Sequence, residues 1–259
     1  MSKKTSLLQY LMRTGRFAKA FDAEQAIRNG KVSVNSAIVE NPRFFLKQRT
    51  AIVSVGGQTA KPVRKLYFLF NKPRGVICQK SPEEQTIYGF FDSLSLSQEE
   101  KSSLFAVGRL DKDTEGLLII TNDGELSNML MRPDASVPKT YSVVSQRPLS
   151  HPDITKLQAG VAISVDHEKY TTSPCTIRKT GNSTFLMTIT EGKKNQIKLM
   201  LGAVDNEVAY LKRLSVGNLE LGSIAPGDLK QTTREMLLSA CRGGETARIR
   251  ENAGGSITS

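Results

Sequence analysis

Apolar side chains in the first part of the chain follow a helical spacing and then a strand-like alternation. Leucine and methionine recur at helical spacing over residues 7–12, and Gly15 ends this pattern. A second helix is predicted from Asp22, as its N-cap, to Gly30, as its C-terminal stop. Residues 31–39 then alternate with period two around a turn, which predicts a short hairpin.

The rest of the chain is dominated by short apolar runs. Residues 66–70 and 117–121 have the composition of buried strands, and the spacing of residues 126–130 predicts a helix. Residues 93–103 are polar with scattered leucines, which is typical of either a short helix or a loop. Further short alternating runs lie at Tyr141–Val144, Cys175–Ile177, Phe185–Thr190 and Leu219–Leu221. This pattern favours an α+β fold with a mixed, largely antiparallel sheet over a doubly wound one.

A linker divides the chain into two predicted domains. Another strand is expected over residues 51–55, and residues 59–62 read as a linker. We therefore expect a small N-terminal α+β domain over residues 1–60 and a larger domain over residues 61–241. Residues 242–259 are rich in glycine and polar side chains, which predicts a disordered tail.

The charge of the chain is concentrated near its N-terminus. The formal net charge is +11, with 36 Lys and Arg against 25 Asp and Glu among 259 residues. Residues 1–65 hold 13 of these cations and only three of the anions. This distribution indicates a polyanion-binding module joined to a near-neutral body. No apolar run has the roughly 20 residues that span a bilayer, and no secretory signal is expected.

Cysteine and histidine are too sparse to suggest a metal site or a disulfide framework. The three cysteines are Cys78, Cys175 and Cys241, and the two histidines are His151 and His167. None of the cysteines forms a Cys-x-x-Cys pair. We expect no metal ion, free thiols that serve packing or lie on the surface, and a cytoplasmic protein.

The densest charged segment is the candidate site of chemistry. Five of the nine residues from Gly108 to Gly116 are charged, and they run directly into the apolar residues 117–121. A solvated turn would explain this composition. A reacting carboxylate would also be well placed there, because a buried strand holds such a loop rigidly.

Several blocks of residues fall in a fixed order along the chain. They are Asn71–Gly75; Gly108–Asp111 with Thr114, Gly116–Leu118 and Thr121–Gly124; Lys139–Tyr141; and Glu191–Lys193 with Asn195–Lys198 and Met200, followed by Leu211–Arg213. Together these blocks resemble the signature of the RsuA family of pseudouridine synthases that act on ribosomal RNA. The N-terminal segment also resembles the small RNA-binding module shared by a small-subunit ribosomal protein and tyrosyl-tRNA synthetases. The similarity extends to about Thr233.

The resemblance implies an isomerisation that needs neither a metal ion nor an organic cofactor. Uracil is detached from its ribose, rotated and reattached through carbon. The resemblance assigns the essential aspartate to Asp111, which can act as a nucleophile or as a base. Lys198 matches the basic residue that keeps this carboxylate ionised, although it could be an ordinary surface lysine. Tyr141 matches the aromatic residue that stacks on uracil, although core packing is an alternative.

Two further residues of these blocks are predicted to contact RNA. By resemblance, Arg109 fills the gap left by the extracted base, with a structural ion pair as the alternative. Gln196 belongs to the Glu191–Met200 block. In that block Asn195 and Leu199 depart from the basic residues common in the family, which affects substrate contacts more than the reaction. The remaining acidic residues of the central block are expected to be structural: Asp113, Glu115 and Asp123.

The N-terminal module carries a group of basic residues suited to RNA phosphates. They are Arg13, Arg16, Lys19, Arg28 and Lys31. Such residues often only solvate a surface, but the charge excess favours phosphate contacts that weaken with salt. Few aromatic residues are interspersed among them, which favours recognition of folded RNA by shape over stacking on single-stranded bases.

These observations predict a pseudouridine synthase that modifies one uridine in ribosomal RNA or an assembly intermediate. The expected protein is a monomer without a DNA or membrane partner. Two alternatives remain: a non-catalytic RNA-binding protein of ribosome assembly, and a synthase acting on transfer RNA. The choice between small- and large-subunit RNA stays open, because it depends on RNA shape and on surface residues.

Overall fold

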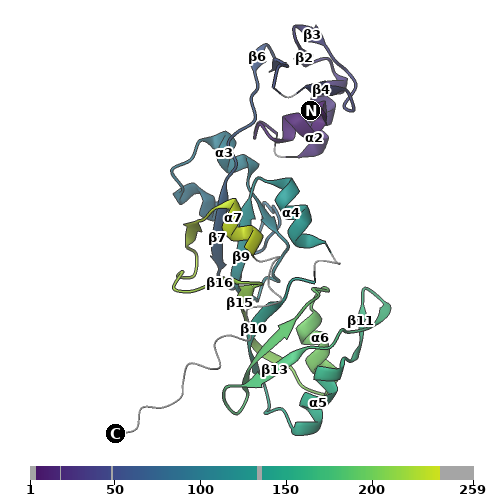
Figure 1. Ribbon diagram of the computed structural model, residues 1–259, viewed down its shortest axis with the longest axis vertical. Coiled ribbons are helices and arrows are strands. Elements are labelled where there is room, and N and C mark those ends of the chain that lie inside the picture. Colours follow the sequence, from purple (N-terminus) through teal and green to yellow (C-terminus); the bar gives the residue numbers. More distant parts are fainter. Residues whose placement is uncertain (1–3, 18, 48, 133–135, 240–259) are drawn as a thin grey trace. The chain divides into compact units, whose positions relative to one another are not determined.

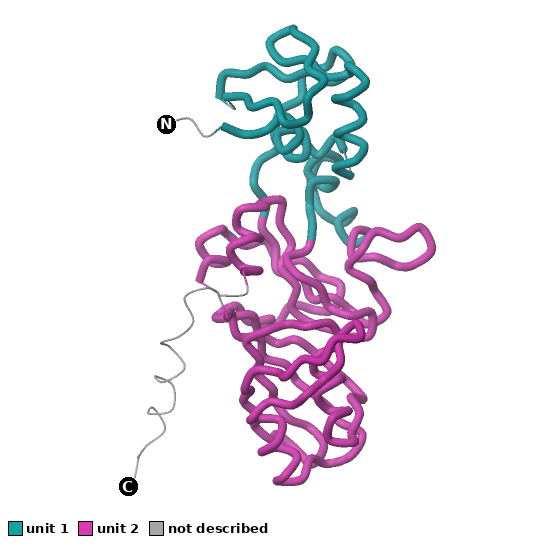
Figure 2. Tube along the Cα trace, turned by 90° about the vertical axis from the view of Figure 1, so that its right-hand side faces the viewer, with its two compact units in different colours: residues 1–66, 89–105 teal, residues 67–88, 106–259 magenta. Residues whose placement is uncertain are grey.

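The computed structural model describes residues 4–17, 19–47, 49–132 and 136–239 (Figure 1). The chain divides into two compact units (Figure 2). Unit 1 comprises residues 1–66 and 89–105, and unit 2 comprises residues 67–88 and 106–259. Cys241 and the predicted tail lie outside the described residues.

Unit 1 combines two short helices with small sheets. The helices are α1 (Leu7–Met12) and α2 (Ala20–Arg28), and the strands are β1 (Lys4–Ser6), β2 (Val32–Val34), β3 (Ala37–Ile38), β4 (Phe45–Lys47), β5 (Val53–Val55) and β6 (Gln58–Thr59). One sheet has the order β3-β2-β5-β6, and β1 pairs with β4. The hairpin predicted over residues 31–39 is confirmed as β2 and β3. Its turn residues Asn35 and Ser36 both have positive φ, as a two-residue hairpin turn of type I′ requires.

The start of α2 differs from the sequence prediction. Asp22 is not the N-cap; that position belongs to Lys19, whose backbone is extended. Asp22 lies in the first turn, where a negative charge interacts favourably with the helix N-terminus. An acidic residue is favoured at both positions, so its presence alone does not fix the first residue of the helix.

Residues 89–105 pack within unit 1 although they follow the first strand of unit 2 along the chain. They include the end of a 3₁₀ helix (Ile87–Ser93) and α3 (Gln98–Ser103), so the segment that could be helix or loop contains both kinds of structure. A Cβ on Gly15 would lie 1.9 Å from the carbonyl oxygen of Glu99. Nε of Arg64 lies 2.6 Å from Oε1 of Glu100. Glycine at position 15 therefore permits the close approach of these two chain segments.

Unit 2 is built on a nine-stranded sheet. Its strands are β7 (Tyr67–Lys72), β8 (Phe105–Val107), β9 (Glu115–Thr121), β10 (Lys139–Ser145), β13 (Thr176–Lys179), β14 (Thr184–Ile189), β15 (Val208–Val216), β16 (Leu219–Glu220) and β17 (Leu229–Gln231). The main order is β13-β14-β10-β15-β9-β7-β17, with β16 on β15 and β8 on β9. β9 and β15 are parallel, whereas β10, β14 and β7 pair antiparallel with their neighbours. The predicted α+β fold with a mixed, largely antiparallel sheet is confirmed.

Helices and one hairpin flank this sheet (Figure 1). They are α4 (Gly124–Met131), α5 (His151–Ala159), α6 (Gln196–Gly202), α7 (Arg234–Ser239) and the hairpin of β11 (Ala162–Val165) and β12 (Glu168–Thr171). α4 and α7 contact each other and share a core cluster with β9, which includes Leu117, Leu126 and Leu237. α5 contacts β13, and α6 contacts β15 and β11.

The parallel junction of β9 and β15 depends on one glycine. Gly116 pairs with Arg213, and a Cβ on Gly116 would lie 2.2 Å from the carbonyl oxygen of Arg213. The φ of Gly116 is +113°, which L-residues rarely adopt. The charged segment that begins at Gly108 lies immediately before this junction, so the sheet fixes where that segment emerges.

Candidate active site

The segment between β8 and β9 is held from both sides of Asp111. On one side, the thiol of Cys78 accepts a bond from the amide of Leu110 and donates to its carbonyl, both at 3.4 Å. On the other side, the carbonyl of Lys112 accepts from the amide of Gly75 at 2.8 Å. The amide of Thr114 donates to the carbonyl of Asp111 at 3.0 Å, which closes a turn. The backbone at Asp111 is therefore fixed by its neighbours, as a reacting group requires.

A buried lysine supports the same segment. Lys72, at the end of β7, has no exposed surface. Its ammonium donates to the carbonyl of Val76 at 2.6 Å, of Pro73 at 3.0 Å and of Lys112 at 3.3 Å. Burial lowers the pKa of Lys72, and nearby anionic groups, including Asp113 and Asp111, oppose this shift. The ammonium thus ties residues 72–76 to the candidate catalytic segment.

A glutamate network fixes the start of α6. Nε2 of Gln196 donates to Oε1 of Glu191 at 2.5 Å, and Oε1 of Gln196 accepts from the amide of Lys193 at 2.9 Å. Glu191 also accepts from Ser173 and from the hydroxyl of Tyr170, on β12. The network joins the β11–β12 hairpin to the helix that carries Lys198.

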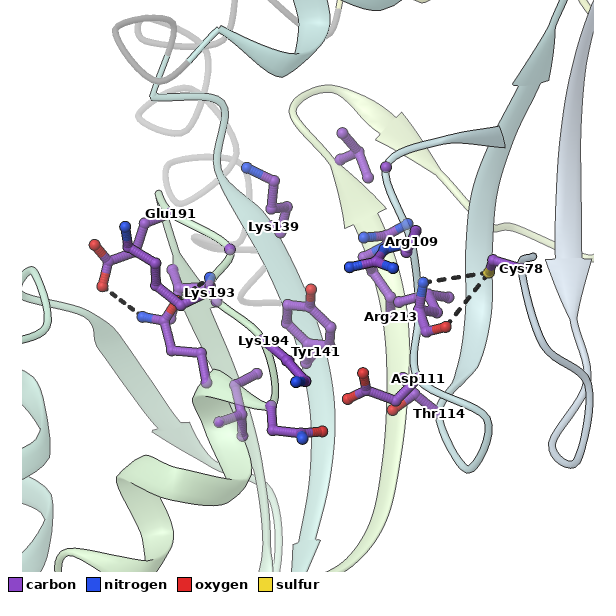
Figure 3. A pocket seen from close by; sticks show the side chains of 18 of the residues that line it. Cys78, Arg109, Asp111, Thr114, Lys139, Tyr141, Glu191, Lys193, Lys194 and Arg213 are labelled. Atoms are coloured by element: carbon purple, nitrogen blue, oxygen red, sulfur yellow. Dashed lines mark hydrogen bonds between the residues drawn. The ribbon is translucent and has the colours of Figure 1, made fainter. Parts of the chain in front are cut away.

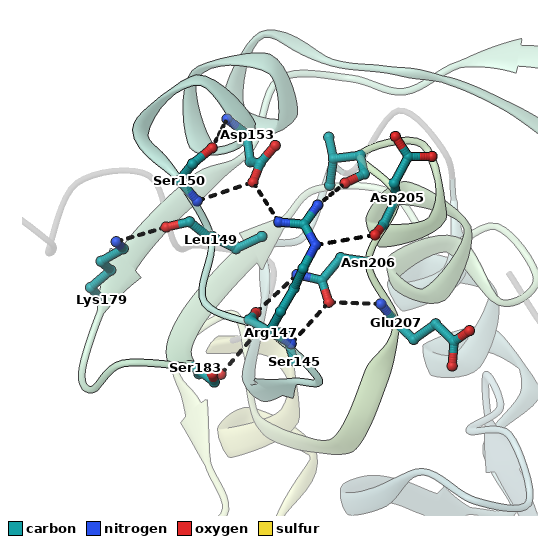
Figure 4. Close-up of polar contacts among 11 residues, drawn as sticks. Ser145, Arg147, Leu149, Ser150, Asp153, Lys179, Ser183, Asp205, Asn206 and Glu207 are labelled. Carbon is teal, nitrogen blue, oxygen red and sulfur yellow. Dashed lines mark hydrogen bonds and ion pairs between the residues drawn. The ribbon is translucent and has the colours of Figure 1, made fainter.

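An arginine holds the loop that follows α6 (Figure 4). The guanidinium of Arg147 donates to the carbonyl of Asp205 at 3.2 Å and to the carbonyl of Val204 at 2.5 Å. It also pairs with Asp153 at 3.2 Å. The carbonyl of Ala203, the C-cap of α6, accepts from the ammonium of Lys156 at 2.8 Å, and a cation beside the last carbonyls satisfies groups that a helix end leaves free. Both ends of the short helix are therefore anchored.

Lys198 lies between two carboxylates. Its Nζ is 2.5 Å from Oδ1 of Asp113 and 3.5 Å from Oδ2 of Asp111. Burial opposes ionisation of Asp113, but the hydrogen bond and charge of Lys198, aided by Arg74, lower the pKa of this carboxyl. The predicted approach of Lys198 to Asp111 is present, and Asp113 is a closer partner that the sequence did not indicate.

Tyr141 lies in the row of paired residues that crosses the sheet at the parallel junction of β9 and β15. On β10 it pairs with Arg213, and Arg213 pairs in turn with Gly116. Tyr141 is 7% exposed and Arg213 is 6% exposed. Nε of Arg213 donates to the carbonyl of Leu117 at 2.7 Å, so the side chain of this arginine is fixed against the backbone of β9. Its place in the Leu211–Arg213 block was the only sequence signal for it.

These groups line one cleft of about 990 Å³ within unit 2. Asp111, Tyr141, Lys198, Arg109 and Gln196 all contribute to its lining. Figure 3 shows Asp111 and Arg109 on one wall, Lys193 and Glu191 on the other, and Tyr141 between them. Apolar side chains such as Leu110, Met131 and Val216 complete the wall. A cleft with apolar walls, carboxylates that include Asp111, and several cations suits a planar base attached to an anionic backbone.

Two of the predicted residues have distinct settings in this cleft. Arg109 is exposed. Gln196 is 3% exposed and engaged with Glu191, so it shapes the wall, and its predicted contact with RNA stays a prediction. Lys139 was named from the sequence only as the first residue of the Lys139–Tyr141 block, without a role; it lines the cleft and donates to the carbonyl of Val137 at 2.8 Å. Burial and the charge of Arg213 lower the pKa of Lys139, against the influence of Glu191.

The five basic residues predicted to bind RNA in the N-terminal segment all lie in unit 1. Arg16, Lys19, Arg28 and Lys31 are exposed, and Arg13 is half-buried. The guanidinium of Arg16 donates to the carbonyls of Gln58 and Thr59, and Arg28 pairs with Glu24 at 2.6 Å. Lys19 and Lys31 are therefore the simplest positions at which to test a phosphate contact.

Neither a metal cluster nor a membrane span is found in the described part of the chain. Among the described residues, no group of three or more His, Cys, Asp and Glu side chains could hold a metal ion. Within the same ranges, no helix is long and apolar enough to cross a membrane.

Comparison with known families decides the class of the protein. Residues 66–203 match the family model described as RNA pseudouridylate synthase. The chain belongs to this family. The match contains Asp111, Tyr141 and Lys198, and the chain is accordingly a pseudouridine synthase, an isomerase that acts on RNA.

Individual relatives agree with this family and with the RsuA group. An uncharacterized RNA pseudouridine synthase of Bacillus subtilis is 34% identical over 233 residues, covering 89% of this chain and 96% of the relative. Ribosomal small subunit pseudouridine synthase A is 33% identical in Salmonella typhimurium and 32% identical in Escherichia coli, in both cases over 84% of this chain and 92% of the relative.

A solved structure supports the fold. A crystal structure of a pseudouridylate synthase superposes with a TM-score of 0.63 at 28% identity, covering 86% of this chain and 94% of that chain. The predicted family, fold class and enzyme class are confirmed.

Proposed function

We propose that this pseudouridine synthase converts one specific uridine of ribosomal RNA, with Asp111 as the catalytic carboxylate. The convergence of Asp111, Tyr141 and Lys198 on one cleft carries this proposal. Relatives named as ribosomal small subunit synthases support ribosomal RNA as the substrate. Small-subunit RNA is therefore the first substrate to test.

The proposed reaction is balanced within the nucleotide. The glycosidic bond from C1′ to N1 breaks, a bond from C1′ to C5 forms, and the proton on C5 moves to solvent while N1 gains one. Asp111 acts on the ribose side as a nucleophile at C1′ or as a base that sets up a glycal. Both routes use the negative charge of the carboxylate, and we assign the ammonium of Lys198, 3.5 Å from Oδ2 of Asp111, as the cation that faces it.

The target uridine must leave its helical stack to reach this carboxylate. Flipping costs a few kcal/mol, which contacts to the extruded base and to the remaining gap offset. We assign the face of Tyr141 to the uracil ring and the exposed guanidinium of Arg109 to the gap in the RNA. Unit 1 docks on the RNA through its basic residues.

The test is pseudouridine mapping on ribosomal RNA incubated with the purified protein. Asp111→Asn removes the charge with little change in shape, and we expect a loss of about 1000-fold or more in the rate of modification. Binding of the RNA should persist in this variant, because the side chain is one of many lining groups. Modification by Asp111→Asn at the wild-type rate would disprove the assignment.

Parallel substrates separate the alternatives. Small-subunit, large-subunit and transfer RNA are incubated separately with the wild-type protein. Product on transfer RNA alone would replace the proposed substrate. Binding to ribosomal RNA with no product on any of the three would support a role in ribosome assembly without catalysis.

A further inference from the structure

The ammonium of Lys198 forms its shorter contact with Asp113, not with Asp111. The contact of 2.5 Å with Asp113 is a charge-assisted hydrogen bond, whereas 3.5 Å to Asp111 exceeds the usual length of an N–H···O bond. One cation is therefore shared unequally by two anions that lie two residues apart in the chain.

This unequal sharing suits a carboxylate that must react. A direct hydrogen bond from an ammonium would occupy lone pairs of Asp111 and weaken it as a nucleophile or base. A cation that stays close without bonding still interacts favourably with the negative charge of the carboxylate. The position of the ammonium between the two carboxylates therefore leaves the lone pairs of Asp111 free to react.

A lysine head group does not hold such a position by itself. Its four-carbon stem has many rotamers, and fixing them costs entropy. The backbone of α6 is anchored by Gln196 at its start and by Lys156, which donates to the carbonyl of Ala203, at its end. Asp113 adds the restraint on the head group, and it belongs to the same fixed turn as Asp111.

The pair has little to contribute to folding. The side chains of Asp113 and Lys198 are 56% and 28% exposed, and exposed ion pairs add little stability. Loss of Asp113 should therefore be visible in the reaction without unfolding the protein.

We infer that Asp113 is a positioning residue that holds Lys198 beside Asp111 and out of a direct hydrogen bond with it. The inference rests on the proposed function of Asp111. Asp113 does not touch the substrate in this arrangement and acts only through Lys198. Its effect must then disappear when Lys198 is absent.

A double-mutant cycle tests this dependence. Asp113→Asn, Lys198→Met and the double variant are compared with wild type in single-turnover modification of the RNA at saturating enzyme. Asp113→Asn should lower the single-turnover rate about 10- to 100-fold, the scale expected for misplacing a group near the reacting atoms, with little change in RNA affinity. The double variant should be no slower than Lys198→Met alone.

An exposed carboxylate in the same unit, away from the cleft lining, serves as the control. Glu207 accepts a hydrogen bond from Nε2 of Gln146 at 2.8 Å, and neither residue lines the cleft. Glu207→Gln removes one negative charge, and its single-turnover rate should stay within about twofold of wild type. Asp113→Glu should recover part of the rate, because a longer carboxylate can still reach the ammonium.

The outcomes separate this inference from the proposed function. An inactive Asp111→Asn with additive effects of Asp113→Asn and Lys198→Met would overturn the inference and leave the function intact. A wild-type rate in Asp113→Asn would also overturn it. A fully active Asp111→Asn would instead remove the proposed function on which the inference rests.

Discussion

The thiol of Cys78 bonds both backbone groups of Leu110, the residue that precedes Asp111 in the chain. Its sulfur lies 3.4 Å from the amide nitrogen and 3.4 Å from the carbonyl oxygen of Leu110. Cys78 is 8% exposed and lines the cleft. A thiol is a weak donor and acceptor, but these contacts are buried, where an unpaired backbone group is costly.

Replacing this thiol should loosen the segment that carries Asp111. We expect Cys78→Ala to lower the free energy of unfolding by about 1–3 kcal/mol, because Leu110 loses two partners and a small cavity forms. The rate of modification should fall with it, because the backbone before Asp111 is less restrained. Urea unfolding and single-turnover modification measure the two effects, and Cys78→Ser should restore part of the rate by keeping a donor and an acceptor.

Cys175 provides the matched control for this prediction. Its thiol donates to the carbonyl of Leu157 at 3.2 Å, and it does not line the cleft. Cys175→Ala should lower stability without changing the single-turnover rate of the folded protein. Equal losses of rate in the two alanine variants would show that Cys78 has no particular effect on Asp111.

The junction of β9 and β15 should not tolerate a side chain at Gly116. A Cβ there would lie 2.2 Å from the carbonyl oxygen and 2.7 Å from the amide nitrogen of Arg213. We expect Gly116→Ala to cost more than about 3 kcal/mol, because strands must separate and the φ of +113° is unfavourable for alanine. Loss of the folded baseline in thermal or urea unfolding is the measurement.

A second glycine controls for the general effect of added bulk. Gly124, at the start of α4, has room for a side chain, because a Cβ there would meet no atom within 4 Å, and its φ is not positive. Gly124→Ala should change stability by less than about 1 kcal/mol, with a gain expected from helix propensity. If both variants unfold alike, close approach of the strands is not what requires glycine at position 116.

Sequence alone locates the principal groups of the cleft but not how they are held. Asp111, Tyr141 and Lys198 were assigned from local blocks, and they line the same cleft. The Lys198–Asp113 contact joins residues 85 positions apart, and the contacts of Cys78 with Leu110 join residues 32 apart. Such pairs depend on the finished sheet, and no local spacing encodes them.

The extent of burial explains which helices and strands can be predicted from the hydrophobic pattern. The apolar run ending at Thr121 predicts β9 because most of that strand is buried. The helix α5 buries only Leu157, so its apolar pattern is too weak to recognise. Its capping box at Ser150 and the proline after His151 are the signals from which it could have been predicted.

Tyr67 should make stability depend on alkaline pH. Its hydroxyl donates to Oδ2 of Asp123 at 3.0 Å, and burial together with this carboxylate raises the pKa of Tyr67 to about 12 from 10.0. The folded pKa lies above the unfolded value, so the stabilisation is complete below pH 10 and is lost as pH rises through about 12. Tyr67→Phe should cost about 1–2 kcal/mol at neutral pH, and its difference from wild type should shrink between these limits.

Urea unfolding of both proteins across this alkaline range measures that difference directly. Other lysines and tyrosines titrate in the same range, but they are common to both proteins and cancel in the comparison. If the difference in free energy of unfolding stays constant up to the pH at which the wild type unfolds, then the hydrogen bond to Asp123 does not raise the pKa of the Tyr67 hydroxyl.

Lys19 and Lys31 should contribute to RNA affinity through phosphate contacts. Both side chains are exposed in unit 1, and replacing both by glutamine removes two charges without disturbing its core. Each phosphate contact contributes about 0.7–0.9 to the slope of log affinity against log salt, so the double variant should reduce the slope by up to about 2. Filter binding of ribosomal RNA over a range of salt concentrations measures the slope.

A lysine of unit 2 provides the charge control. Lys230 is exposed on β17, and Lys230→Gln should leave the slope nearly unchanged. If the slope falls by the same amount per removed charge in both variants, RNA affinity depends on the net charge of the protein and not on particular contacts of unit 1. A fall in slope confined to the unit 1 variant supports RNA docking by this unit.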